Sequence, residues 1–133
     1  MELQLKITGI LLVMLAIIHI AFPRYFDWKK DCQPMSLINR QMMYVHTFFI
    51  AITVFLMGLL CFFGAADILT TRLGKLIALG MAIFWGLRLV FQFFVYSSAL
   101  WKGKRFETGM HIIFSLLWIY LTGFFLYVFM LYK

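Results

Sequence analysis

The stretch QMMYVHTFFIAITVFLMGLLCFFGAA, residues 41–66, decides the fold class, because it contains no charged side chain over its whole length. A helix of about 20 apolar residues is long enough to cross the hydrocarbon core of a bilayer. Helices and closed barrels are the structures that satisfy the backbone in lipid, and a continuous apolar run favours the helix. We therefore predict a transmembrane helix over this run.

Three further apolar runs lie at residues 5–22, 74–96 and 109–131. The first lacks a signal-peptide cleavage pattern, so we interpret it as a retained helix. Alternation with a period of two residues, which a membrane barrel would need, is absent. Short connections favour antiparallel neighbours. The sequence therefore predicts an all-α membrane protein, an antiparallel up-and-down bundle of four transmembrane helices in a single domain over residues 1–133.

The composition agrees with a membrane protein. Hydrophobic residues make up 65% of the chain and charged residues 13%, against roughly 25% charged residues in a typical soluble domain. The net charge of +7 does not indicate nucleic-acid binding, because the basic residues sit in short clusters between the apolar runs. The expected partner is the lipid bilayer, with a homo-oligomer or another membrane protein as further options.

The basic residues also predict an orientation. Residues 23–40 and 101–107 together carry seven Lys and Arg, whereas both termini and the connection after residue 66 together carry four. Cytoplasmic loops are enriched in Lys and Arg. We therefore predict a multi-pass protein of a bacterial inner membrane, with the two longer loops in the cytoplasm and both termini outside it.

Five polar side chains inside the apolar runs predict one internal site. His19, His46 and His111 each lie within about six residues of a cytoplasmic helix end, which places them roughly 6–9 Å below one membrane face. Gln92 joins this layer, and Arg88 lies one turn deeper. Each residue belongs to a stripe at helical spacing, and polar stripes of membrane helices face the bundle interior. The sequence therefore predicts that these five residues meet.

Arg88 raises the question of what neutralises a buried charge. A charged side chain near the bilayer centre costs at least ~2.5–3.5 kcal/mol. All the acidic residues lie in tails, loops or helix boundaries: Glu2, Asp27, Asp31, Asp67 and Glu107. An acid folding inward, with Glu107 the first candidate, would offset this cost. Water with backbone carbonyls, or an anionic ligand, would also do so.

Two cofactors fit three histidines at one depth. Haem b would take two of His19, His46 and His111 as axial ligands, and Arg88 would pair with its propionates. A transition metal would take all three imidazoles and leave a position open, with Glu107 supporting His111. A quinone head or small anion held by Arg88, Gln92 and a histidine is a third option. The alternative is that each histidine only forms a hydrogen bond to a neighbouring helix and that no cofactor is bound.

We therefore predict a membrane protein that binds haem or a transition metal for a redox or electron-transfer role. The alternative is a non-catalytic accessory or assembly subunit of a membrane complex. Enzymatic status stays open, because no serine or cysteine has a histidine and an acid at a nucleophile spacing. Cys32 and Cys61 are predicted at opposite membrane faces, too far apart for a disulfide. The nine methionines are interpreted as packing residues, because their spacing forms no copper-transport ladder.

Overall fold

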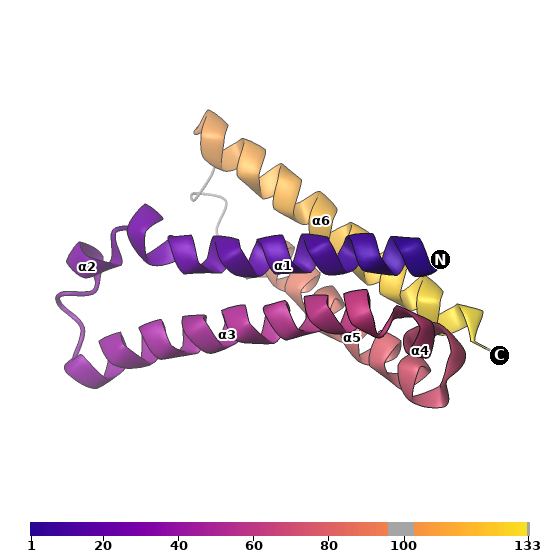
Figure 1. Ribbon diagram of the computed structural model, residues 1–133. Coiled ribbons are helices and arrows are strands. Elements are labelled where there is room, and N and C mark those ends of the chain that lie inside the picture. Colours follow the sequence, from indigo (N-terminus) through magenta and orange to yellow (C-terminus); the bar gives the residue numbers. More distant parts are fainter. Residues whose placement is uncertain (96–102, 133) are drawn as a thin grey trace. The chain divides into compact units, whose positions relative to one another are not determined.

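The computed structural model describes residues 1–95 and 103–132, and every regular element in them is a helix (Figure 1). The predicted all-α fold is therefore confirmed. Two elements are short helices, α2 (Trp28–Asp31) and α4 (Ala65–Thr70). The four long helices are α1 (Glu2–Tyr25), α3 (Leu37–Phe63), α5 (Arg72–Phe94) and α6 (Arg105–Leu131).

All four long helices have the length and apolar composition needed to cross a membrane. In each of these helices, at most 33% of the most apolar stretch of 18 residues is buried. Large apolar side chains cover their outer faces, and Phe63, Phe94 and Met130 are 79%, 83% and 70% exposed. Water-soluble proteins rarely expose apolar surface on this scale. The chain is therefore a multi-pass membrane protein whose helices present their apolar faces to lipid.

The chain divides into two compact units, Met1–Ala65 and Ala66–Lys133. In the first unit α1 and α3 run antiparallel (Figure 1), and their backbones touch at two glycines. A Cβ added to Gly9 would lie 2.5 Å from the carbonyl oxygen of Gly58. A Cβ added to Gly58 would lie 2.6 Å from the carbonyl oxygen of Gly9. Glycine at both positions therefore permits this close packing.

In the second unit α5 and α6 run antiparallel as well (Figure 1). Buried Trp85, Leu121 and Phe125 contribute to its core. The predicted up-and-down order thus holds inside each unit. That the two units make up one domain stays a prediction.

All four long helices begin two to four residues before the predicted runs, and only the end of α6, at Leu131, coincides with its predicted end. The α1 helix continues through Pro23 to Tyr25 instead of ending at residue 22, because a proline in the last turn removes only one backbone hydrogen bond. The α3 helix ends at Phe63, where Gly64 caps it, three residues before the predicted end. The predicted end of the third run, Tyr96, lies outside the described residues.

The connection between the predicted runs 41–66 and 74–96 is largely helical, because α4 extends to Thr70 and α5 begins at Arg72. The hydroxyls of Thr70 and Thr71 donate to carbonyl oxygens one turn earlier, at 2.8 and 2.7 Å. The Thr71 hydroxyl also accepts from the Gly74 N–H at 2.9 Å and so caps α5. A Cβ at Gly74 would collide with the backbone of Asp67 and Ile68. Glycine here allows α4 and α5 to meet tightly.

Candidate ligand site in the second unit

Polar and indole side chains meet on the facing sides of α5 and α6. Their positions along each helix differ by three or four residues, the spacing that puts side chains on one helical face. We call this set the α5–α6 polar cluster. Its members are Trp85, Arg88 and Gln92 on α5 and His111, Ser115 and Trp118 on α6.

The side-chain amide of Gln92 is the centre of the cluster. Its Oε1 accepts from Arg88 Nη1 at 3.3 Å and from Trp118 Nε1 at 3.4 Å. Its Nε2 lies 2.7 Å from His111 Nδ1. Gln92 is only 7% exposed, and a buried amide needs such partners to offset the loss of water. One amide therefore ties the two helices together in a hydrogen-bonded network.

This network fixes which atom of the Gln92 amide faces His111. Arg88 and Trp118 can only donate, so the oxygen of the Gln92 amide must face them. The amide nitrogen then faces His111 and donates, which requires a lone pair on Nδ1. The Nδ1 atom of His111 therefore accepts this hydrogen bond. A metal ion bound at Nε2 would leave the imidazole proton on Nδ1, where it would oppose the Gln92 donor.

Aromatic rings form one wall of the cluster. The rings of Trp85 and Trp118 stack with their centroids 5.3 Å apart and an interplanar angle of 9°. The guanidinium carbon of Arg88 lies 4.9 Å from the ring centroid of Trp118. A cation over an indole face is stabilised by the ring quadrupole, and more strongly when water is excluded. Arg88 therefore contacts Trp118 in two ways. Its guanidinium lies over the indole ring, and both side chains donate to the same Gln92 oxygen.

Two donors of the cluster are buried without a hydrogen-bond partner among the described residues: Trp85 Nε1 and Ser115 Oγ. Trp85 is 2% exposed and Ser115 is 7% exposed. Ser115 follows His111 by one helical turn and precedes Trp118 by another, and both of those residues bond to Gln92. An unsatisfied buried polar group costs about 1–3 kcal/mol. The cluster thus contains two hydrogen-bond donors that a ligand can satisfy.

Of the five predicted site residues, the structure brings together Arg88, Gln92 and His111. His19 belongs to the first unit, where its Nδ1 lies 2.8 Å from the Leu15 carbonyl oxygen and donates to it, one turn earlier on the same helix. His46, also in the first unit, is exposed on α3. Among residues 1–95 and 103–132, no three His, Cys, Asp or Glu side chains are grouped to hold a metal ion. Coordination by all three histidines stays a prediction.

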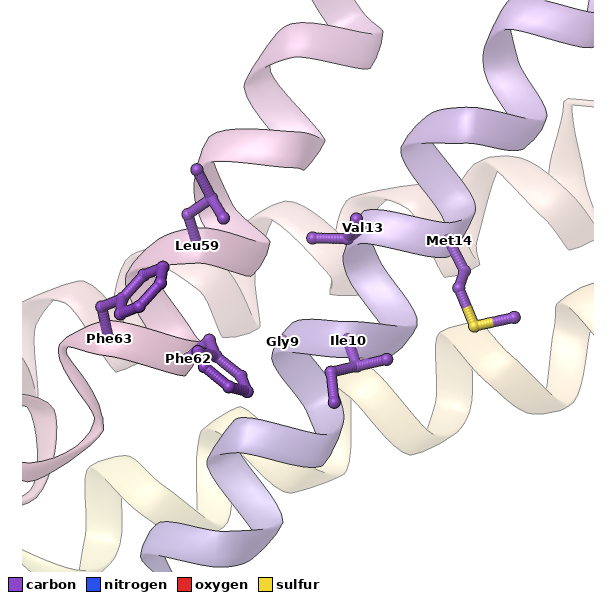
Figure 2. Close-up of a pocket in the computed structure, with 7 residues that line it drawn as sticks. All are labelled: Gly9, Ile10, Val13, Met14, Leu59, Phe62 and Phe63. Carbon is purple, nitrogen blue, oxygen red and sulfur yellow. The ribbon is translucent and has the colours of Figure 1, made fainter.

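The first unit contains a cavity of about 260 Å³ between α1 and α3 (Figure 2). Its lining is entirely apolar and offers no hydrogen bond or charge to a ligand. It borders the glycine contact of the two helices. The lining residues are Gly9, Ile10, Val13, Met14, Leu59, Phe62 and Phe63.

Sequence reasoning missed three members of the polar cluster as binding residues: Trp85, Ser115 and Trp118. All three lie three or four residues from another member on the same helix, so the spacing contained the signal. Spacing along one helix does not give the register between two antiparallel helices, and this register places Trp118 beside Gln92. Comparison of the chain with protein-family models, curated proteins and solved structures found no match.

Proposed function

We propose that this protein binds the oxygen-bearing head of a lipophilic small molecule at the α5–α6 polar cluster. The observation that carries the proposal is a pair of buried donors, Trp85 Nε1 and Ser115 Oγ, that have no hydrogen-bond partner in the described part of the chain. A ligand oxygen that accepts from them removes a desolvation cost that the unliganded protein bears. The ligand reaches the cluster from the bilayer, because the surrounding helices are membrane-spanning in length and composition.

The donor set defines the chemistry of the ligand. The Arg88 guanidinium, the indole N–H of Trp85 and the hydroxyl of Ser115 all favour an acceptor oxygen, such as a quinone carbonyl or a carboxylate. The stacked indoles of Trp85 and Trp118 offer apolar surface beside these donors. A quinone head would combine acceptor oxygens with a flat ring, and it would give the protein the redox role that the histidines first suggested.

Binding can be measured on the full chain in detergent by quenching of tryptophan fluorescence. A short-tailed benzoquinone and a fatty acid of equal chain length distinguish the two sources of acceptor oxygen. Ser115→Ala should weaken binding by about tenfold, since one hydrogen bond to a charged or strongly polar group is worth ~1.5 kcal/mol. Thr53→Val, which changes an exposed hydroxyl on α3, should leave affinity unchanged. If neither compound binds, or if Ser115→Ala binds as the parent does, the proposal fails.

Haem or metal binding by His19, His46 and His111 is the second candidate. The observation in its favour is that Gln92 holds the ring of His111 through Nδ1, as partners of metal-bound histidines do. It requires the Gln92 amide to turn over, which would set its nitrogen against the donors of Arg88 and Trp118. A Soret band lost in His46→Ala would support haem. Elemental analysis of purified protein would test a metal. A colourless, metal-free preparation that co-purifies with a stable partner would favour an accessory subunit.

We also propose that the chain lies in a bacterial inner membrane with both termini outside the cytoplasm, on the basis of the Lys and Arg bias of its loops. A single cysteine at Lys6→Cys, in a background with Cys32→Ser and Cys61→Ser, tests this orientation. A membrane-impermeant maleimide should label it in intact cells after the outer membrane is permeabilised. Labelling only after cell lysis would show that the N-terminus lies in the cytoplasm, which is the opposite orientation.

A further inference from the structure

We propose that Cys32 and Met43 form a binding site for Cu(I), separate from the α5–α6 polar cluster. The Cys32 Sγ lies 3.7 Å from the Met43 Sδ. The two residues are 11 positions apart and belong to different elements, since Cys32 caps α2 and Met43 lies in the first half of α3. Thiolate and thioether are the soft ligands that select Cu(I).

The backbone holds Cys32 in place from both sides. Its N–H donates to the carbonyl oxygen of Trp28 at 2.9 Å, and its own carbonyl oxygen accepts from the Met35 N–H at 3.1 Å. The ring of Trp28 contacts the ring of Tyr44 edge-on, with centroids 5.4 Å apart. This contact packs α2 against α3. The thiol is therefore positioned before any ion arrives, and binding does not have to order the loop.

The separation of the two sulfur atoms suits a shared ion. With a metal–sulfur bond of ~2.3 Å, a sulfur–sulfur distance of 3.7 Å corresponds to an angle of about 107° at the metal. That angle is close to the tetrahedral value, so the pair can bind one ion with small adjustments. Met43 is half-buried whereas Cys32 is 3% exposed. Met43 is therefore the more accessible of the two ligands to an arriving ion.

The surroundings favour Cu(I) over zinc. A structural zinc site uses four ligands drawn from Cys, His, Asp and Glu, and the described parts of the chain bring no three of these together. Thioether sulfur is a soft ligand that Zn²⁺ seldom takes. Binding converts the Cys32 thiol to a thiolate with release of one proton, and the copper stays in the Cu(I) state throughout.

The test is a competition for Cu(I) between the full chain in detergent and a chromogenic Cu(I) chelator, under anaerobic conditions with ascorbate. The parent protein should withdraw one equivalent of Cu(I). Cys32→Ser and Met43→Leu should each weaken binding by ~10-fold or more, since even the loss of an outer-shell partner costs 10–100-fold. Met43→Leu is a near-isosteric change, so it tests the thioether in a folded protein.

Met42→Leu and Cys61→Ser are the matched controls. Met42 is the exposed neighbour of Met43 on α3, and Cys61 is a buried thiol near the other end of that helix. Both variants should bind Cu(I) as the parent does. The proposal is overturned if the parent does not compete with the chelator, or if Cys32→Ser and Met43→Leu retain parental affinity. Because quinone binding is measured separately, neither result affects the proposal for the second unit.

Discussion

Gln92 donates from its side-chain nitrogen to His111 Nδ1 across 2.7 Å, and this bond joins α5 to α6. The same amide accepts from Arg88 and Trp118 through its oxygen. Three side chains therefore bond to one amide. In a membrane, such partners are hard to replace, because the hydrocarbon offers none.

Gln92→Leu should destabilise the second unit strongly. The change removes the acceptor of the buried Trp118 N–H, at a cost of about 1–3 kcal/mol, and it also removes the bonds of the amide to Arg88 and His111. Thermal or SDS-induced unfolding of the purified protein measures the loss. Gln41→Leu, at an exposed position on α3, is the control and should change stability by less than ~0.5 kcal/mol. Equal stability of the two variants would contradict the central role of Gln92.

Ser115→Ala should have opposite effects on the unliganded and liganded protein. Without ligand, the change removes an unsatisfied buried hydroxyl and should raise stability by up to ~1–3 kcal/mol. With a saturating quinone or fatty acid, the variant should gain less stability from the ligand than the parent does. Melting temperatures with and without ligand give both numbers. A loss of stability in the unliganded variant would show that the hydroxyl already has a partner.

Gly58→Ala should separate α1 from α3. The new Cβ would lie 2.6 Å from the Gly9 carbonyl oxygen, so the backbones must move apart, at a cost of about 1–3 kcal/mol. Gly123→Ala is the matched control, because a Cβ there meets no atom within 4 Å. That control should stabilise α6 by ~1 kcal/mol through helix propensity. Unfolding midpoints that shift in the same direction for both variants would contradict the close contact.

Lys75→Met should loosen the end of α6. The Lys75 Nζ donates to the Tyr132 carbonyl oxygen at 3.4 Å and lies 4.9 Å from the centroid of the Phe129 ring. Methionine keeps the apolar stem but loses both interactions, at a cost of ~0.5–1 kcal/mol for the cation–π contact. Hydrogen exchange of the last turn of α6 should accelerate. Lys6→Met, which removes an exposed pair with Glu2, should leave that exchange unchanged.

The sequence was sufficient for the four membrane helices, because the length of an apolar run and the thickness of a bilayer are both simple quantities. Helical spacing also placed Arg88, Gln92 and His111 on facing stripes, and the structure brings these three side chains together. The bond that His19 makes is not readable from the sequence. Any polar side chain on a helix can bond to a carbonyl one turn earlier, and a stripe pattern cannot show that His19 does so.

The turn between the two units shows a second limit. The composition of residues 67–73 suggested a short connection, yet the hydroxyls of Thr70 and Thr71 bond backward along the chain and support α4. The contact between Cys32 and Met43 shows a third. Sequence spacing treats the methionines as separate packing residues, whereas the fold of residues 27–36 returns the thiol to α3. Each case depends on a local bond that periodicity does not encode.

The contact between Gly9 and Gly58 has a mechanical consequence for the first unit. No side chain separates the two backbones there, so α1 and α3 cannot approach further at this point. From Gly9 to the end of α1 at Tyr25 the helix extends for about 24 Å at 1.5 Å per residue. A change of a few degrees in the crossing angle at this contact would therefore move the far end of α1 by about an ångström or two.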